Sequence, residues 1–128
     1  MEYIEACLEQ AGLQALSMSF DLARSMAALR SFGREGAPRV LLLSSQYHAS
    51  GVNLQAARNL ILVHPYCTPS ASCPEAVSYT ALRAYEMQAI GRVRRYPQQK
   101  ACRVFRLYAE GSVEQSLYSG LYNGGLFS

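Results

Sequence analysis

Residues 86 to 99 read EMQAIGRVRRYPQQ and bring three arginines into four consecutive positions, directly after a glycine. Gln88, Arg92 and Arg95 are spaced i, i+4 and i+7, so in a helix they line one stripe, and Gly91 lies beside it. A guanidinium group is a planar fork that can bind two phosphate oxygens at once. The pattern Q-x-x-G-R-x-x-R therefore predicts a helix face that offers an amide, a bare stretch of backbone and two guanidinium groups to an anion.

The glycine is the unusual member of this pattern. In a helix, glycine lowers stability by about 1 kcal/mol relative to alanine, and close approach by a ligand or another backbone would compensate for Gly91. A solvated basic helix end is the alternative, because arginines there interact favourably with the helix dipole. Leu82, Ala89 and Val93 form a second stripe that can face a sheet, and Glu86 lies on their side. We expect the arginines of the first stripe to lack carboxylate partners and to point outwards at the carboxyl edge of the sheet.

A second segment, SSQYHASGVNLQAARNLILVHP at residues 44–65, precedes the arginine helix. A buried strand runs into a loop of small residues that includes Ser50 and Gly51, and Asn53 can cap a short helical turn. Loops with free amide groups at the carboxyl ends of parallel strands are common ligand sites. An ordinary strand-to-helix turn would explain this loop alone, but its place ahead of the arginine helix makes the pair specific.

Composition bounds the class of protein. The 128 residues fit one domain and are half apolar, which excludes a disordered tail. Net charge is only +3, yet seven of the twelve basic residues lie between Arg83 and Arg106, where Glu86 is the one acid, which indicates an anionic partner. The four cysteines lack zinc-ligand spacing, so we expect reduced thiols and no metal. Without a membrane-length apolar run or a signal-peptide pattern, we expect an intracellular protein.

Helical and strand periodicities alternate along the chain, which predicts an α/β fold with a parallel sheet. The apolar runs at 40–43, 60–63 and 104–107 should be neighbouring parallel strands, with the arginine helix packed on the sheet. The expected elements are helices at 2–11, 22–32 (with Asp21 as its cap), 79–95 and 112–122, strands at 13–19, 39–45, 60–64 and 103–108, and an exposed loop at 66–78.

Two segments of the chain resemble motifs of a known protein family. SGVNLQAARNLILVHP resembles motif V, and QAIGRVRRYPQQKACRVFRLYAEGSVEQSLY resembles motif VI, of the C-terminal RecA-like lobe of superfamily 2 helicases, closest to the Swi/Snf-type chromatin remodelling ATPases. The likeness runs from about residue 13 to residue 122. It implies a RecA-like parallel sheet flanked by helices, of the P-loop NTPase type and incomplete at its N-terminus.

The resemblance also implies roles for single residues. Arg92 and Arg95 match the arginines that reach across the cleft between the lobes to ATP, where they would serve as the catalytic arginine fingers. Gln88 and Gly91 would belong to the same ATP-binding, interlobe face.

Ser50, Gly51 and Asn53 match the motif V loop, which contacts the nucleic-acid backbone and couples it to the nucleotide site. Tyr47 and His48 stand where the family usually has small glycine residues, and they are the main departure within this loop.

The sequence contains neither a G-x-x-x-x-G-K-[ST] loop nor an acidic box for magnesium. In the family these belong to the N-terminal lobe, which would bind most of the ATP and Mg²⁺. We therefore expect residues 1–128 to be a single helicase C-terminal domain, a fragment of a larger two-lobe ATPase, with half an active site and no activity alone. An N-terminal RecA-like lobe, in cis or in trans, is the implied partner, and the resemblance implies a nuclear location.

Three functions are compatible with these observations. The leading interpretation is the C-terminal motor lobe of an ATP-dependent DNA translocase. The alternative is a non-catalytic remnant lobe that binds nucleic acid or protein through its basic face. An RNA helicase lobe is less favoured, although the sequence does not distinguish DNA from RNA. A Rossmann-type enzyme is disfavoured because no G-x-G-x-x-G follows a strand.

Overall fold

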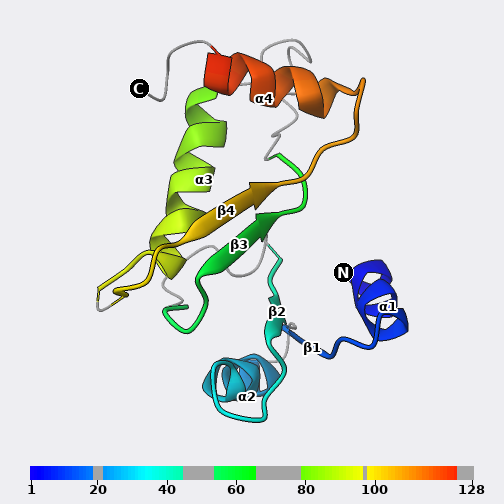
Figure 1. Cartoon of the computed structure of the whole chain (residues 1–128), viewed down its shortest axis with the longest axis vertical. Coiled ribbons are helices and arrows are strands. Elements are labelled where there is room, and N and C mark those ends of the chain that lie inside the picture. Colours follow the sequence, from blue (N-terminus) through cyan, green and yellow to red (C-terminus); the bar gives the residue numbers. More distant parts are fainter. Residues whose placement is uncertain (19–21, 45–53, 66–78, 97, 124–128) are drawn as a thin grey trace. The chain divides into compact units, whose positions relative to one another are not determined.

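The structure is a computed structural model that describes residues 1–18, 22–44, 54–65, 79–96 and 98–123. Along these residues the elements follow in the order α1, β1, α2, β2, β3, α3, β4 and α4 (Figure 1). The chain forms two compact units, Met1–Val52 and Asn53–Ser128. Each unit contains a pair of parallel strands.

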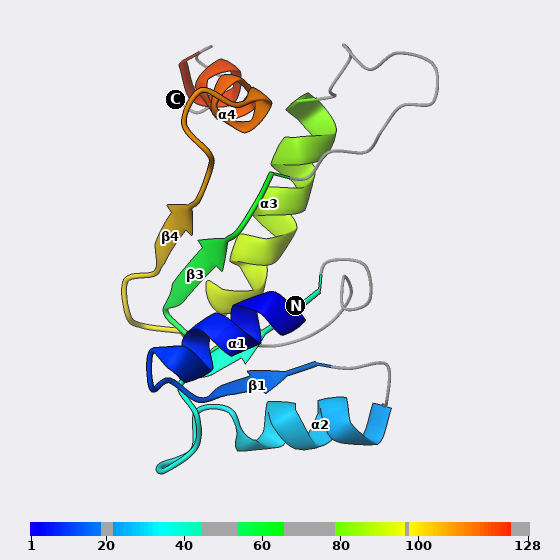
Figure 2. The ribbon, with the colours of Figure 1, turned by 90° about the vertical axis from the view of Figure 1, so that its right-hand side faces the viewer.

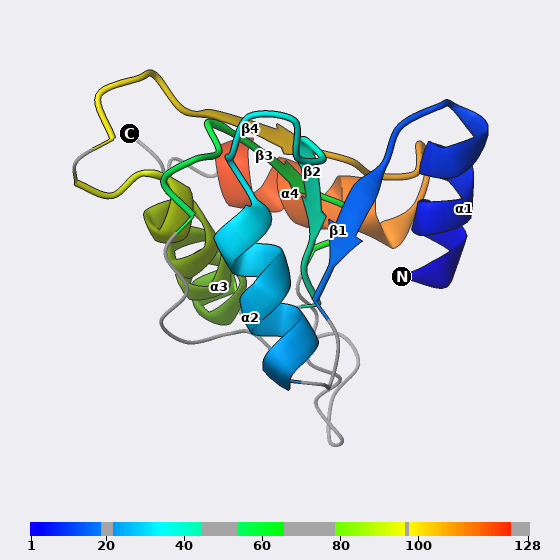
Figure 3. The ribbon, with the colours of Figure 1, turned by 90° about the horizontal axis from the view of Figure 1, so that it is seen from below.

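The first unit is built around β1 (Ala15–Ser17), which pairs in parallel with β2 (Val40–Leu42). Parallel neighbours require a crossover, and α2 (Leu22–Ser31) supplies it. Helix α1 (Glu2–Gln10) lies on the other side of β1 from α2, as Figures 2 and 3 show. The chain leaves α1 at Gly12, as predicted, with a φ of 76° that glycine adopts without steric cost.

The second unit pairs β3 (Asn59–Leu62) in parallel with β4 (Arg103–Arg106), so that Leu60 lies opposite Val104. Helix α3 (Tyr79–Val93) connects them and runs antiparallel to both strands, whereas α4 (Val113–Asn123) packs against α3 beyond the strands (Figures 1 and 2). The buried apolar side chains of this unit are those of Leu54, Leu62, Leu82, Val93, Leu117 and Tyr118.

The α/β prediction is confirmed, and the runs at 60–63 and 104–107 are neighbouring parallel strands as expected. The run at 40–43 belongs to the first unit and these strands to the second. That the run is their neighbour stays a prediction. Ile61, in β3, is 58% exposed, and Val63, directly after it, is 47% exposed, so one face of this strand is not covered within the second unit. Only one face is covered within this unit, since α4 packs against α3 rather than against the sheet.

The arginine helix ends earlier than predicted. Its last helical residue is Val93, two positions before Arg95, although the amide of Arg94 still donates to the carbonyl of Ile90 at 2.8 Å. The residue before a proline avoids helical geometry, so the chain must leave the helix before Tyr96. A turn follows, in which the amide of Gln98 donates to the carbonyl of Arg95 at 2.7 Å.

Two predicted features, the Asp21 cap and the 66–78 loop, lie outside the described residues. Among the residues that are described, no helix is long and apolar enough to cross a membrane.

Candidate functional site

The packing stripe of α3 is present, whereas the predicted outer stripe of Gln88, Arg92 and Arg95 is incomplete because Arg95 lies beyond the end of the helix. Leu82, Glu86 and Val93 are at most 2% exposed and face the interior of the second unit. Gln88 and Gly91 are exposed on the other side of the helix. A single helix therefore separates a packing face from a solvent face, as its periodicity indicated.

Gly91 has no packing reason to be a glycine. A Cβ atom built on it would meet no neighbouring heavy atom within 4 Å among the described residues. The backbone at this position is also not in the positive-φ region that favours glycine. An alanine would fit in this space and favour the helix, so packing among the described residues does not explain the glycine.

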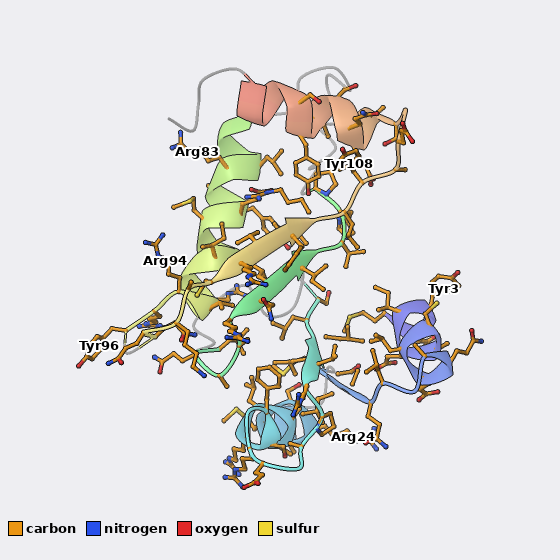
Figure 4. The ribbon with its side chains drawn as sticks, in the orientation of Figure 1. Tyr3, Arg24, Arg83, Arg94, Tyr96 and Tyr108 are labelled. Carbon is orange, nitrogen blue, oxygen red and sulfur yellow. The ribbon has the colours of Figure 1, made fainter. Side chains whose placement is uncertain are left out.

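Arg92 and Arg95 differ in their surroundings. Arg92 is half-buried in the last turn of α3, and it interacts with other residues of the chain. Arg95 is exposed in the segment after the helix, and no hydrogen bond or ion pair joins its guanidinium to the described residues. Figure 4 shows the neighbouring Arg94 and Tyr96 projecting away from the ribbon at this end of α3, and Tyr96 is 91% exposed.

The expected position at the carboxyl edge of the sheet is wrong. The carboxyl end of α3 lies near the amino ends of β3 and β4 (Figures 1 and 2). The cause is the crossover: a helix that connects two parallel strands runs antiparallel to them, so its last turn returns to the edge where the next strand begins. The basic face therefore extends along the outer stripe of α3 and past its end, not along the strand tips.

Glu86, the one acid in the sequence between Arg83 and Arg106, forms an ion pair with Arg106 of β4. Its carboxylate accepts from Arg106 Nη2 at 2.9 Å and from Arg106 Nε at 3.1 and 3.2 Å. Glu86 is 2% exposed, and Arg106 is 24% exposed in its side chain. This ion pair was not predicted, although two signals were present: Glu86 follows Leu82 by four positions, and Arg106 is two positions beyond the inward-facing Val104.

Four hydrogen bonds join the segment at 54–57 to the end of the arginine helix. The amide of Leu54 donates to the carbonyl of Arg92 at 3.0 Å. The side chain of Gln55 donates to the carbonyl of Tyr96 at 2.6 Å. The side chain of Gln98 donates at 2.9 Å to two carbonyls, those of Gln55 and Ala57. The sequence did not indicate these contacts, because the two segments are about forty positions apart.

The predicted nucleic-acid residues Ser50, Gly51 and Asn53 lie outside the described residues, as do Tyr47 and His48. Leu54, the next residue along the chain, is buried at 6% exposure and makes the bond to Arg92 described above. Within the described part of the chain, no group of three or more His, Cys, Asp or Glu side chains could hold a metal ion.

Comparison with solved structures identifies the class of fold. The chain is similar to the crystal structure of the C-terminal part of the Fun30 ATPase domain, with a TM-score of 0.73 and 19% sequence identity over 92% of this chain and 34% of that one. The fold is thus similar to that of the C-terminal part of this ATPase domain, with parallel strands flanked by helices. No protein-family model matches the sequence.

The chain is also similar in sequence to named proteins. The chain is 32% identical over 84 residues to the DNA repair and recombination protein RAD54 of Saccharomyces cerevisiae, covering 66% of this chain and 8% of that protein. It is 35% identical over 79 residues to the DNA repair protein rhp54 of Schizosaccharomyces pombe, covering 62% and 8%. It is 33% identical over 97 residues to the DNA (cytosine-5-)-methyltransferase DMT5 of Cryptococcus neoformans, covering 76% and 4%.

The chain thus spans less than a tenth of the length of each of these relatives. The predicted resemblance is confirmed: the chain is a relative of the Swi/Snf-type ATPases of helicase superfamily 2.

Proposed function

We propose that the chain is the C-terminal motor lobe of an ATP-dependent DNA translocase of Swi/Snf type, with Arg92 and Arg95 as its arginine fingers. The observation that carries this proposal is the outer face at the end of α3. There, an exposed Arg95 without a partner among the described residues lies four positions beyond a glycine that internal packing does not require. Among the described residues no carboxylate pairs with Arg95, which suits a group that must reach a phosphate across a cleft, and Glu86 pairs with Arg106 of β4.

The residues present fit the phosphate part of ATP rather than its metal ion. Guanidinium groups are permanent cations with several N–H donors and no acceptor, so they bind phosphate oxygens and cannot ligate Mg²⁺. ATP with Mg²⁺ supplies the transferable γ-phosphoryl group, and an N-terminal RecA-like lobe, in cis or in trans, would hold most of it. In this scheme Arg95 neutralises the charge that develops on the transferring group. Gln88 and Gly91 form the surface against which the other lobe closes.

DNA is the proposed track. RAD54 and rhp54 are by name DNA repair proteins, which favours DNA over RNA and a nuclear location. In the proposed scheme Ser50, Gly51 and Asn53 contact phosphates of the tracked strand, since a translocase needs backbone contacts rather than base reading. Remodelling of chromatin is one use of such a motor.

The decisive experiment supplies the other half of the active site. Residues 1–128 are placed after a RecA-like lobe that carries a Walker A loop and an acidic box, and ATP turnover is measured with and without duplex DNA. Arg95→Ala should lower turnover by about 10³-fold, as loss of an arginine finger does, while ATP binding is kept. Arg94→Ala removes the same charge from the neighbouring exposed position and should leave turnover within about two-fold. Near-normal turnover in Arg95→Ala would contradict the finger role and favour the alternative, a solvated basic helix end.

A non-catalytic remnant lobe is the second candidate. Tyr96, which is 91% exposed and follows two exposed arginines, favours this candidate, because aromatic rings beside cations form stacking surfaces for nucleic-acid bases. If the two-lobe enzyme is inactive with wild-type residues 1–128 and the chain alone still binds DNA, the remnant function is favoured over the motor.

A further inference from the structure

We propose that Gln55 and Gln98 are positioning residues that hold the end of the arginine helix in place. Their side chains, together with the bond from Leu54 to Arg92, form what we call the amide clamp. It fastens the segment carrying Arg92 and Arg95 to the segment that directly follows the 50–53 loop. The role given to the arginines rests on the proposed function, whereas the clamp itself is a property of this chain.

The two glutamines cross between the segments in opposite directions. Gln55 reaches from the 54–57 segment to the carbonyl of Tyr96, and Gln98 reaches back to the carbonyls of Gln55 and Ala57. Reciprocal crossing fixes both the separation of the segments and their shift along one another, which a single bond would not do.

The chemistry of Gln98 also fixes which way its amide points. Two carbonyl oxygens can be met only by the NH₂ group, whose two hydrogens are then both used. The remaining oxygen, Oε1, accepts from the amide of Lys100 at 3.3 Å. Replacement by glutamate would therefore keep the shape of the side chain and set an oxygen against two carbonyl oxygens.

The clamp matters because Arg95 lies outside the helix that precedes it. The intrahelical bonds of α3 end at Arg94, so the following residues need anchors of another kind. The clamp ties down Arg92 on one side of Arg95 and Tyr96 on the other. A group that acts on a transition state must be held in its working geometry before the reaction, since a small misplacement costs much of the rate.

The first test uses the 128-residue chain and amide hydrogen exchange followed by NMR. Gln98→Glu should speed exchange at the amides of Leu54 and Gln98 by about 10-fold, the effect of losing roughly one net hydrogen bond. The amide of Leu117, in the core of the unit, should exchange at the wild-type rate. Gln99→Glu is the matched control, because it makes the same charge change at an exposed neighbour. Equal exchange rates in both variants would overturn the clamp.

If Gln98→Glu does not fold, Gln55→Glu replaces it, since that change removes one exposed bond and leaves the bonds of Gln98 in place. It should speed exchange at Leu54 by a smaller factor, and unchanged exchange there would overturn the clamp.

The second test measures positioning in the two-lobe enzyme, at a temperature where circular dichroism shows every variant to be folded. Gln98→Glu should lower kcat by about 10-fold and leave the KM for ATP within about two-fold, because ground-state binding does not need the arginines in place. A purely structural residue would leave kcat unchanged once the protein is folded, and that result would overturn the positioning role. If Arg95→Ala also has normal turnover, the proposed function fails instead, and hydrogen exchange alone then decides the clamp.

Discussion

At the scale of single residues, the outer face of α3 departs from what stability alone would select. Gly91 weakens the helix without a steric reason among the described residues, and the exposed Arg95 has no partner there. Residues of this kind are expected where a surface works on something outside its own domain. Their contribution to stability and their contribution to function should therefore have opposite signs.

Gly91→Ala should stabilise the 128-residue chain by about 0.5–1 kcal/mol, since alanine is the better helix former and its Cβ enters open space. Urea unfolding monitored by circular dichroism measures this. Gly111→Ala is the matched control: its Cβ would also meet open space, but its φ of 72° is unfavourable for alanine. That variant should lose about 1 kcal/mol. A destabilised Gly91→Ala would show that the glycine has an internal role.

At the scale of elements, the ion pair between Glu86 and Arg106 joins α3 to β4 across the interior of the second unit. The donation of Arg106 to both of its oxygens stabilises this carboxylate at 2% exposure. The same contact keeps the acid away from the outer stripe. The pair thus contributes both to packing and to the positive potential of the exposed face.

Glu86→Ala should lower the free energy of unfolding by about 3 kcal/mol, because it leaves the charge of Arg106 partly buried without its partner. The double change Glu86→Leu with Arg106→Met should recover most of this loss, since apolar side chains of similar size can replace a buried pair. Glu110→Ala, at an exposed position, should stay within about 0.5 kcal/mol of the wild type. Urea unfolding of the four proteins checks all three values, and equal stability of Glu86→Ala and Glu110→Ala would contradict the prediction.

The periodicity of the sequence was enough to predict each described helix and strand and the packing stripe of α3. It could not predict what depends on tertiary approach. The Gln55–Tyr96 and Gln98–Ala57 bonds join residues that no local pattern relates. To predict the ion pair of Glu86, one would have had to know which β4 side chains face α3. The arginines were expected at the carboxyl edge of the sheet, and this was wrong. A helix that connects two parallel strands ends near the amino end of the second strand, which places the arginines at the opposite edge.

At the scale of the whole molecule, the chain is similar to one part of much longer proteins. It covers 34% of the Fun30 chain and less than a tenth of its sequence relatives, and it carries no phosphate-binding loop of the Walker type. In the proposed function, its arginine and amide groups would complete an active site whose nucleotide is held by another lobe.

The 128-residue chain alone should therefore hydrolyse no ATP above the level of the Arg92→Ala, Arg95→Ala double variant, with or without duplex DNA. A coupled phosphate-release assay checks this, with a lobe that carries a Walker A loop as the positive control. Turnover that is lost in the double variant would contradict the half-site interpretation, because it would show a complete site within these residues.

The amide clamp consists entirely of neutral groups: two glutamine side chains, one backbone N–H and the carbonyls that accept from them. Contacts between arginine and phosphate weaken steeply as ionic strength rises, because they depend on the release of counterions, whereas neutral hydrogen bonds are hardly screened. Adding salt should therefore detach nucleic acid from this lobe and leave the backbone around Arg95 in its working geometry. Potassium chloride thus separates two quantities that mutations would change together, the affinity of the basic face and the geometry of its arginines.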